Sequence, residues 1–541
     1  MFVTVGVENA EKFTPDGTGE PSSDAPGGAD EPVERGVPSE WSSLAADLSR
    51  APNTRPEWRV HDRTHLEFAV DYALNPDAAQ GEFEWEAYFF IPKSLRLNAE
   101  TYSRQDMDSD LQSYIRLGVP PVEFGALTRE PFQILRQAWQ SGDDDAAVRE
   151  ARLFACEVRA AGGRERSRIA DDLGSGRDDV RAAALARAQR MAADAARLRQ
   201  SLSELFGVSS EGASLRESAA AWVDEDISKA VETVLGQLTR DLTDAHAPRQ
   251  LIRTVRQAAV AEARYRLDAG LDGVGAGTLS KRDVEHLEFR RHVLKRFTSS
   301  ALWLEAHARN PAGVAINVFY AIAAGVAMAF ALAMAFVNGR DAHPEQFWIW
   351  AGAVVVAYAG KDRLKAWLQG FFASYVSKKY PHRRWLIRDP ERQQVVGRVD
   401  EWSGFVRDDD MPADVLEARR STGRQPIEDR SAPETVIRHH KSVLVRPATI
   451  QGADARFRAL TEVFRLDLRR WLSHTDDPKR QILYADPISG HIRSAVAPRV
   501  YNIGVVYRLR QTGDAQAPWH RVRVVVSRKG IRRIEHVIPN A

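Results

Sequence analysis

The feature that most constrains this chain is an apolar run from Gly313 to Val337, in which Asn317 is the one strongly polar residue. Its 25 residues form roughly 37 Å of helix, enough to cross a ~30 Å hydrocarbon core with some tilt. A polar segment, Asn338–Gln346, separates it from a second apolar run, Phe347–Gly360. We therefore predict a two-helix transmembrane hairpin, with helices at 311–337 and 344–360.

The second run is short, since 14 residues make only about 21 Å of helix. By length it also fits a buried core helix or a re-entrant segment. Its flanks favour spanning: Trp348, Trp350 and Tyr358 suit a membrane interface, and Lys361 and Lys365 can snorkel.

Charge sets the expected orientation. The loop between the runs holds one cation, Arg340, whereas basic residues cluster on both outer flanks. The positive-inside rule then places both long arms in the cytoplasm. With no signal peptide pattern, an Ala-rich composition and Arg outnumbering Lys, we expect a multi-pass protein of the bacterial inner membrane with cytoplasmic termini. The single cysteine, Cys156, fits a reducing compartment.

Small residues recur at four-residue spacing in the first apolar run. Such spacing lets helix backbones approach closely in lipid, and it favours association of several hairpins into a homo-oligomer. A general alanine bias is the alternative explanation. The predicted helix-packing residues are Asn317, Ala321, Gly325, Ala329 and Ala333.

After the second run, 361–380 reads as an amphipathic interfacial helix whose cations would face anionic headgroups. Its predicted interface residues are Lys361, Arg363, Lys365, Trp367 and Phe371. The motif Lys361-Asp362-Arg363-Leu364-Lys365 resembles uncharacterised bacterial membrane proteins that have two helices followed by a KDR-[IL]-K segment. The resemblance covers 312–375 and implies a topology, with no activity attached.

The part of the chain before the hairpin divides by composition. Residues 1–52 are rich in Gly, Pro, Ser and acids, with ten acidic residues and three cations among the first 50, and we expect a disordered acidic tail. Alternating patterns at 53–130 predict a β-hairpin followed by a helix over Arg104–Leu117. Residues 131–270 predict a helical bundle, with an intermolecular coiled coil as the alternative. Residues 281–310 predict a basic helix leading into the membrane.

The bundle prediction depends on apolar stripes at steps of three and four residues. They are Ala184, Ala188, Met191, Ala195, Leu198, Leu202 and Leu205, and Val231, Leu235, Leu238 and Leu242.

Beyond the hairpin, 381–541 reads as a β-rich cytoplasmic domain interrupted by a helix over Ala453–His474. Its last strands carry cations at largely alternating positions, which would make one strand face basic. A solvated surface is the favoured interpretation of this face. Among partners, anionic lipid is favoured because the chain is tethered, and nucleic acid is disfavoured because stacking aromatics are sparse. The predicted basic-face residues are Arg508, Arg510, Arg521, Arg523, Arg528, Lys529, Arg532 and Arg533.

No catalytic, cofactor or metal motif stands out. The Gly-rich segment 273–277 follows a helix and lies in a linker, which is the wrong context for a dinucleotide fold. His439 and His440 are neighbours in a strand pattern, so they point to opposite faces and cannot easily share a metal. No Ser, Cys or Thr lies in a nucleophile motif. We predict no cofactor, no metal and no catalytic residues, without excluding an enzyme.

The sequence thus predicts an α+β membrane protein: a two-helix hairpin, a mixed β-hairpin and helical arm before it, and a β-rich domain after it. The favoured function is a membrane-anchored scaffold, sensor or binding module. A membrane-anchored enzyme with an unrecognised site, or a subunit of an oligomeric channel or transporter, are the alternatives. Because both arms carry sheet edges that need partners, we expect them to assemble together, with separate domains as the competing arrangement.

Overall fold

The computed structural model describes residues 57–207, 214–271, 277–309, 311–339, 347–420, 434–511, 514 and 517–537. The predicted acidic tail (1–52) lies outside the described residues.

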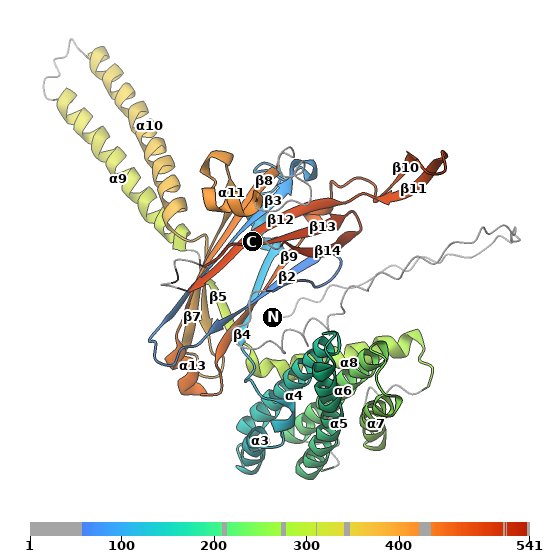
Figure 1. The fold of residues 1–541 in the computed structure, drawn as a ribbon. Coiled ribbons are helices and arrows are strands. Elements are labelled where there is room, and N and C mark those ends of the chain that lie inside the picture. Colours follow the sequence, from blue (N-terminus) through green and yellow to red (C-terminus); the bar gives the residue numbers. More distant parts are fainter. Residues whose placement is uncertain are drawn as a thin grey trace, which may run out of the picture. The chain divides into compact units, whose positions relative to one another are not determined.

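Two large antiparallel sheets form most of the β part of the molecule (Figure 1). The larger sheet has eight strands in the order β14-β13-β12-β3-β8-β7-β6-β5, and the smaller has four in the order β1-β2-β9-β4. The strands of the larger sheet are β3 (Gly81–Pro92), β5 (Glu305–Arg309), β6 (Arg383–Arg388), β7 (Val395–Val406), β8 (Glu434–Val445), β12 (Tyr501–Gln511), β13 (His520–Ser527) and β14 (Gly530–Val537). Those of the smaller sheet are β1 (Glu57–Val60), β2 (His65–Ala73), β4 (Leu111–Leu117) and β9 (Ala459–Asp467).

The two sheets bury one shared hydrophobic core. In β3 the residues at every second position from Phe83 to Ile91 are buried, so one face of the strand supplies core side chains. The ring of Trp85 in the larger sheet lies 5.1 Å from that of Phe68 in the smaller. The pair is therefore a sandwich whose inner faces meet through aromatic side chains.

Strands from before and after the helical hairpin are interleaved in both sheets. β3 pairs with β12 on one side and β8 on the other, and β9 lies between β2 and β4. The expectation that the two arms assemble together is confirmed, and residues 381–541 share their sheets with the N-terminal strands.

Three local predictions in these arms are wrong. β2 and β3 do not form a hairpin, because each joins a different sheet. The helix expected over Arg104–Leu117 ends at Asp110 and continues as β4. The helix expected over Ala453–His474 is absent: the centre of this segment is β9, and a single helical turn follows at Arg469–Leu472. β9 is a central strand buried on both faces, so it lacks the period of two that marks a half-exposed strand.

Short helices connect or cap the strands: α2 (Arg104–Asp110), α11 (Ala413–Arg420), α13 (Pro447–Ala453) and α14 (Arg469–Leu472). A separate two-stranded sheet consists of β10 (Lys479–Ala485) and β11 (Ile492–Pro498).

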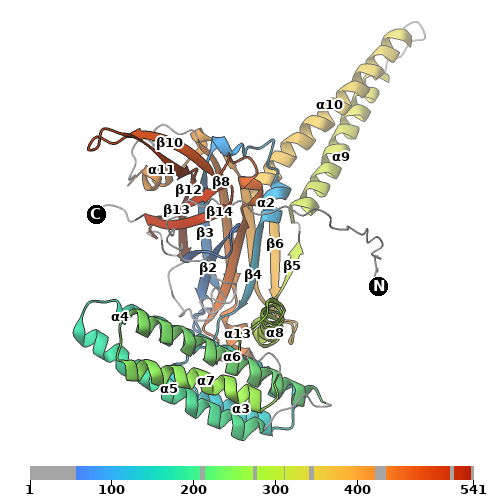
Figure 2. The same cartoon turned by 90° about the vertical axis from the view of Figure 1, so that its right-hand side faces the viewer.

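A helical bundle occupies the chain between β4 and β5 (Figure 2). The predicted stripes are confirmed as core positions: from Ala184 to Leu202 and from Val231 to Leu242 their members are buried, with Leu205 partly buried. They pack against helices of the same chain. The bundle helices are α3 (Glu130–Gln140), α4 (Asp144–Leu173), α5 (Asp178–Phe206), α6 (Leu215–Asp244), α7 (Arg249–Asp268) and α8 (Lys281–Ser299).

Three consecutive acids at the centre of α6 are buried, each facing a different helix. Asp224 Oδ1 accepts a 2.5 Å hydrogen bond from Arg199 of α5. Glu225 pairs with Arg290 of α8 at 2.9 Å. Asp226 pairs with Arg159 of α4. Because successive helical residues point about 100° apart, these ion pairs fix the rotation of α6 within the bundle.

The basic helix at 281–310 does not run into the apolar segment. α8 ends at Ser299, and β5 follows as the edge strand of the larger sheet, paired with β6. Two long helices, α9 (Pro311–Gly339) and α10 (Phe347–Lys379), form an insertion between these two adjacent strands.

The helices α9 and α10 lie side by side (Figure 1). The ring of Phe319 stacks on that of Phe372 at 4.9 Å, and Ala323 and Ala327 are buried. A Cβ at Gly360 would lie 3.5 Å from the Phe330 ring. Small residues thus let the two backbones approach closely.

The predicted two-helix transmembrane hairpin is wrong. Among the described residues one helical segment, Gly313–Met334, is long and apolar enough to cross a membrane. The apolar part of α10 is too short, and the helix runs on without a break through the charged residues Lys361, Asp362, Arg363 and Lys365. The separate segments expected at 344–360 and 361–380 are therefore one helix from Phe347, and a multi-pass inner-membrane topology is not supported. The loop cation Arg340 lies outside the described residues.

Candidate binding cleft on the larger sheet

A cleft of about 730 Å³ lies on the outer face of the larger sheet, the face turned away from the shared core. Strand register explains its composition. Glu86 pairs with Arg508 on one side and with His440 on the other, and His440 pairs with Trp402. Residues opposite each other in register share a face, so four strands contribute to one surface. The lining side chains include Glu86, Tyr88, Arg104, Trp402, Asp410, Asp414, Arg438, Arg508, Arg510 and Trp519.

Aromatic rings form the apolar part of this cleft. Tyr88 and Trp519 lie edge to face with ring centroids 5.9 Å apart. The guanidinium of Arg508 lies 4.1 Å from the Trp519 ring centroid. Across the sheet, the half-buried Trp402 ring lies 5.0 Å from that of His440. These contacts hold the rings in place; Tyr88 is buried, whereas Trp402 and Trp519 remain partly open to solvent.

One carboxylate organises the polar part. The Glu86 carboxylate pairs with Arg438 at 2.6 Å and accepts hydrogen bonds from Arg508 at 3.2 Å and from the Tyr88 hydroxyl at 2.9 Å. Burial would raise the pKa of Glu86, but Arg438 and the hydrogen bonds from Tyr88 and Arg438 bring the net pKa below its ordinary value. Glu86 is therefore ionised and orients two arginine side chains at once.

Helix α11 borders the cleft. Its Val415 is buried against Phe90 and Val506 on the outer sheet face. Asp414 accepts a 2.8 Å hydrogen bond from the Trp519 indole. The helix thus orients the Trp519 ring that lines the cleft.

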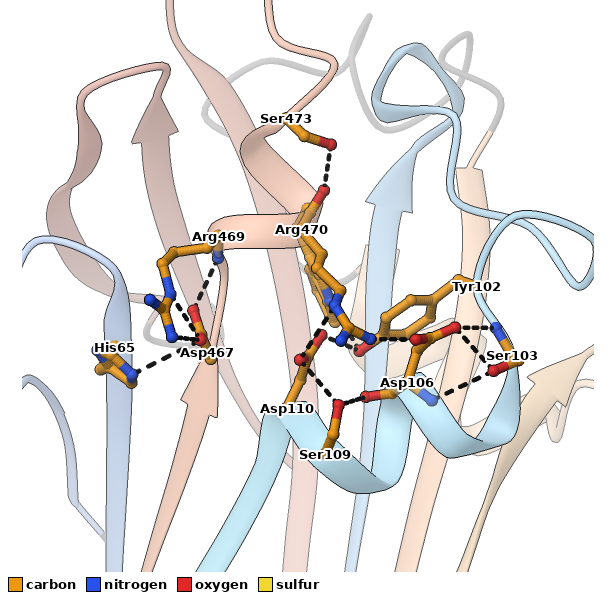
Figure 3. A network of polar contacts seen from close by, with 11 residues as sticks. His65, Tyr102, Ser103, Asp106, Ser109, Asp110, Asp467, Arg469, Arg470 and Ser473 are labelled. Carbon is orange, nitrogen blue, oxygen red and sulfur yellow. Dashed lines mark hydrogen bonds and ion pairs between the residues drawn. The ribbon is translucent and has the colours of Figure 1, made fainter. Parts of the chain in front are cut away.

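Helix α2 brings Arg104 to the cleft, and a polar network fixes the helix (Figure 3). Ser103 caps the helix and exchanges hydrogen bonds with Asp106. Arg470 of α14 forms ion pairs with Asp106 and Asp110. These contacts tie α2 to the end of β9, so the position of Arg104 depends on a distant part of the sequence.

A second polar cluster lies inside the sandwich, beneath the cleft. Lys441 Nζ lies 2.9 Å from Glu401 and 2.5 Å from Glu462. Glu462 also accepts a 2.6 Å hydrogen bond from the Tyr72 hydroxyl. All four side chains are buried. Burial alone would raise the pKa of Glu401, but the neighbouring Lys441 holds it at about 2. The cluster links the two sheets through buried charges.

Ser403 and His439 also lie in this interior. Ser403 Oγ and His439 Nδ1 are 2.6 Å apart, and the two residues are 4% and 2% exposed. Burial and then Lys441 lower the pKa of His439 to about 3, so the ring is neutral. His440 lies on the opposite face against Trp402, as strand alternation predicts. In the described parts of the chain no group of three or more His, Cys, Asp or Glu residues is arranged to hold a metal ion.

The predicted helix-packing residues share one exposed face of α9. Asn317, Ala321, Gly325, Ala329 and Ala333 are exposed. The buried Ala323 and Ala327 lie on the opposite side of the helix, facing α10. The predicted ladder is therefore not the contact between the two helices, and association of several copies through it remains a prediction.

The predicted interface residues lie on α10. Arg363 and Lys365 are exposed, and Trp367 and Phe371 stack with ring centroids 6.0 Å apart. Lys361 Nζ lies 3.8 Å from the Tyr358 ring centroid. An aromatic surface flanked by cations is present here, and its contact with lipid stays a prediction.

The predicted basic face is divided by ion pairs. Arg508 and Arg510 bind Glu86 and Glu84 on β3. Arg523 and Arg533 both pair with Glu535. The remaining members are Arg521, which is buried, Arg528, which pairs with Asp477, and Lys529 and Arg532, which are exposed. Arg508 and Arg510, the two of these residues that line the cleft, are therefore both paired with acidic side chains.

Comparison of the chain with protein-family models, with curated proteins and with solved structures finds no match. Sequence reasoning identified two of the cleft residues, Arg508 and Arg510, as members of a basic strand. It missed Trp402 and Glu86, whose local patterns are those of ordinary strands. The signal that brings them together is the strand register, which is non-local.

Proposed function

We propose that this chain is a binding module, of the scaffold or sensor type, that takes a polar ligand with a planar group into the cleft on the larger sheet. The observation that supports this proposal is that aromatic rings and arginines from separate strands lie in one open cleft, where acidic side chains orient the arginines. Its volume of about 730 Å³ falls within the range of small-molecule sites.

Fixed arginines suit such a ligand. A guanidinium has five donors in a rigid plane, and the bonds from Arg438 and Arg508 to Glu86 leave donors unused. Because Glu86 already orders both side chains, less conformational entropy is lost when a ligand binds. The rings of Trp402 and Trp519 offer flat faces for stacking.

The charge of the cleft argues against a polyanion. Four arginines and three acids line it, so the charge is close to balanced. Nucleic acid binding draws mainly on unpaired cations that neutralise phosphates. We infer that hydrogen bonds and stacking, rather than net charge, select the ligand. The apolar segment of α9 would hold this module at a membrane, a role supported by its length and composition.

The test is a thermal-shift screen of the full chain against nucleosides, aromatic amino acids, dipeptides and monosaccharides. A ligand of the cleft should raise the melting temperature of the wild type and lose at least about tenfold in affinity, or roughly 1.4 kcal/mol, in Trp402→Ala. The matched control is Trp367→Ala on α10, where the ring is 66% exposed and outside the cleft. A ligand whose binding is weakened equally by both changes, or by neither, would place the binding site elsewhere and overturn the proposal.

A further inference from the structure

The arm formed by β10 and β11 is a two-stranded ribbon separate from both larger sheets (Figures 1 and 2). Every residue of β10 is exposed. An isolated hairpin of this kind is marginal in water, and large apolar side chains on its surface point to an interaction site. The arm exposes Ile482, Leu483, Tyr484, Ile488, Ile492 and Val496.

The two faces of the arm differ in chemistry. The register pairs Gln481 with Val496, Leu483 with Ser494, and Ala485 with Ile492, so these residues share one face. Leu483, Ile492 and Val496 on it are 71%, 71% and 64% exposed. The other face pairs Arg480 with Ala497 and Tyr484 with Arg493. The first face thus carries the highly exposed Leu483, Ile492 and Val496, with Gln481 hydrogen-bonded to Ser494 between them and Lys479 at its base. The other face carries Arg480 and Arg493 beside the less exposed Ile482 and Tyr484.

The acidic residue in the turn of the arm, Asp486, is paired within the turn itself. Asp486 forms a 2.8 Å ion pair with Arg493. It accepts a 2.8 Å hydrogen bond from the Ser489 hydroxyl and a 3.0 Å bond from the Ile488 amide. The hydrogen bond from Ser489 is the largest contribution to the lowered pKa of Asp486, so the carboxylate stays ionised and internally paired. The side chain of Ile488, 96% exposed, is left at the tip.

The base of the arm is cationic. Lys479 and Arg480 begin β10, and within the described residues neither forms an ion pair. Highly exposed apolar side chains close to unpaired cations are the combination that favours the headgroup region of an anionic bilayer. The same chain carries a helical segment long and apolar enough to enter a membrane.

We propose that the β10–β11 arm is a lipid-contacting element that lies on an anionic membrane surface. The face with Leu483, Ile492 and Val496 turns toward the acyl chains, Ile488 enters beside them, and Lys479 and Arg480 contact the headgroups. This inference is independent of the proposed ligand cleft.

Two adjacent residues give a matched test, because Leu483 and Ile482 point to opposite faces. The single natural cysteine, Cys156, is buried, so a cysteine introduced on the arm can be labelled selectively. Leu483→Cys and Ile482→Cys would each carry an environment-sensitive NBD fluorophore in the full chain. Each would be mixed with vesicles of phosphatidylcholine alone, or of phosphatidylcholine and phosphatidylglycerol in equal parts.

We expect NBD emission at position 483 to rise at least about twofold with the anionic vesicles, and to rise much less at 482 or with phosphatidylcholine alone. A local fluorophore reports the arm itself, so binding of the chain through α9 does not produce this difference. Equal signals at the two positions, or no rise at 483, would overturn the proposal. A rise at 483 that follows protein concentration without vesicles would instead show that a second copy covers the arm.

Discussion

The Nζ of Lys441 lies 2.5 Å from Glu462 Oε1, and this contact joins the two sheets of the sandwich through their inner faces. Lys441 comes from β8 of the larger sheet and Glu462 from β9 of the smaller. With Glu401 also 2.9 Å from Lys441 Nζ, one buried cation serves two buried carboxylates.

Lys441→Met should destabilise the chain strongly. The change leaves the buried Glu462 without its cation and leaves Glu401 with Arg383, at 3.4 Å, as its cationic partner, and breaking such a buried pair costs about 3–5 kcal/mol. Urea unfolding monitored by tryptophan fluorescence measures the loss. The combined variant Lys441→Met with Glu401→Gln and Glu462→Gln should recover a large part of it, because no buried charge then remains. A loss of under ~1 kcal/mol in Lys441→Met alone would show that the pair contributes no more than a surface contact.

Glu157 of α4 should make stability fall with rising pH. Burial raises its pKa from 4.5 to about 8, an effect that Arg456 opposes. Its carboxyl oxygens have no hydrogen-bond partner among the described residues, and Arg456 is 3.9 Å away. The pKa of Glu157 is higher in the folded chain than in the unfolded one. Its contribution to the free energy of unfolding is therefore complete below pH 4.5 and is lost as the pH rises to about 8.

The slope in that window is roughly 1.4 kcal/mol per pH unit. Glu157→Gln keeps the shape and removes the ionisation, so its stability should vary less with pH. Denaturant midpoints collected across the window provide the measurement. The control is Glu391→Gln, an exposed residue paired with Arg149. An unchanged pH slope in Glu157→Gln would disprove the assignment.

Asp226→Ala should loosen the helical bundle. The change leaves Arg159 buried and removes the 2.7 Å hydrogen bond from Thr298. We expect a loss of about 3–5 kcal/mol, measured by thermal or urea unfolding. Asp179→Ala, which removes an exposed partner of Arg177, is the matched control and should cost under ~1 kcal/mol. Equal losses in the two variants would mean that burial of the acid plays no part.

The α9–α10 insertion should be removable. β5 and β6 are adjacent antiparallel strands, with Arg309 opposite Arg384. Replacing residues 310–383 with Asn-Gly joins Arg309 to Arg384 by a two-residue hairpin turn, which keeps the strand register. The shortened chain should keep its cooperative melting transition and lose partitioning into detergent. Gly325→Ser within α9 retains the segment and serves as the control. A shortened chain that fails to fold would show that the helices stabilise the sandwich.

Elements with a clear local period follow from the amino-acid sequence alone. The stripe from Ala184 to Leu202, the alternation in β3 and the apolar length of α9 follow from side chains near one another along the chain. That His439 and His440 point to opposite faces of the sheet follows from strand geometry alone.

Which elements pair depends on contacts between distant parts of the chain. β9 is buried on both faces, so its apolar residues fit a helical period as well as a strand. β2 and β3 are neighbours in sequence, yet they join different sheets, because the partners that complete them come from the other end of the chain. The cleft around Glu86 and Trp402 depends on the same long-range register. The periodicity of a helix or strand is set by residues close together in sequence. Strand register and the identity of the pairing strands are set only when distant strands pack their faces together.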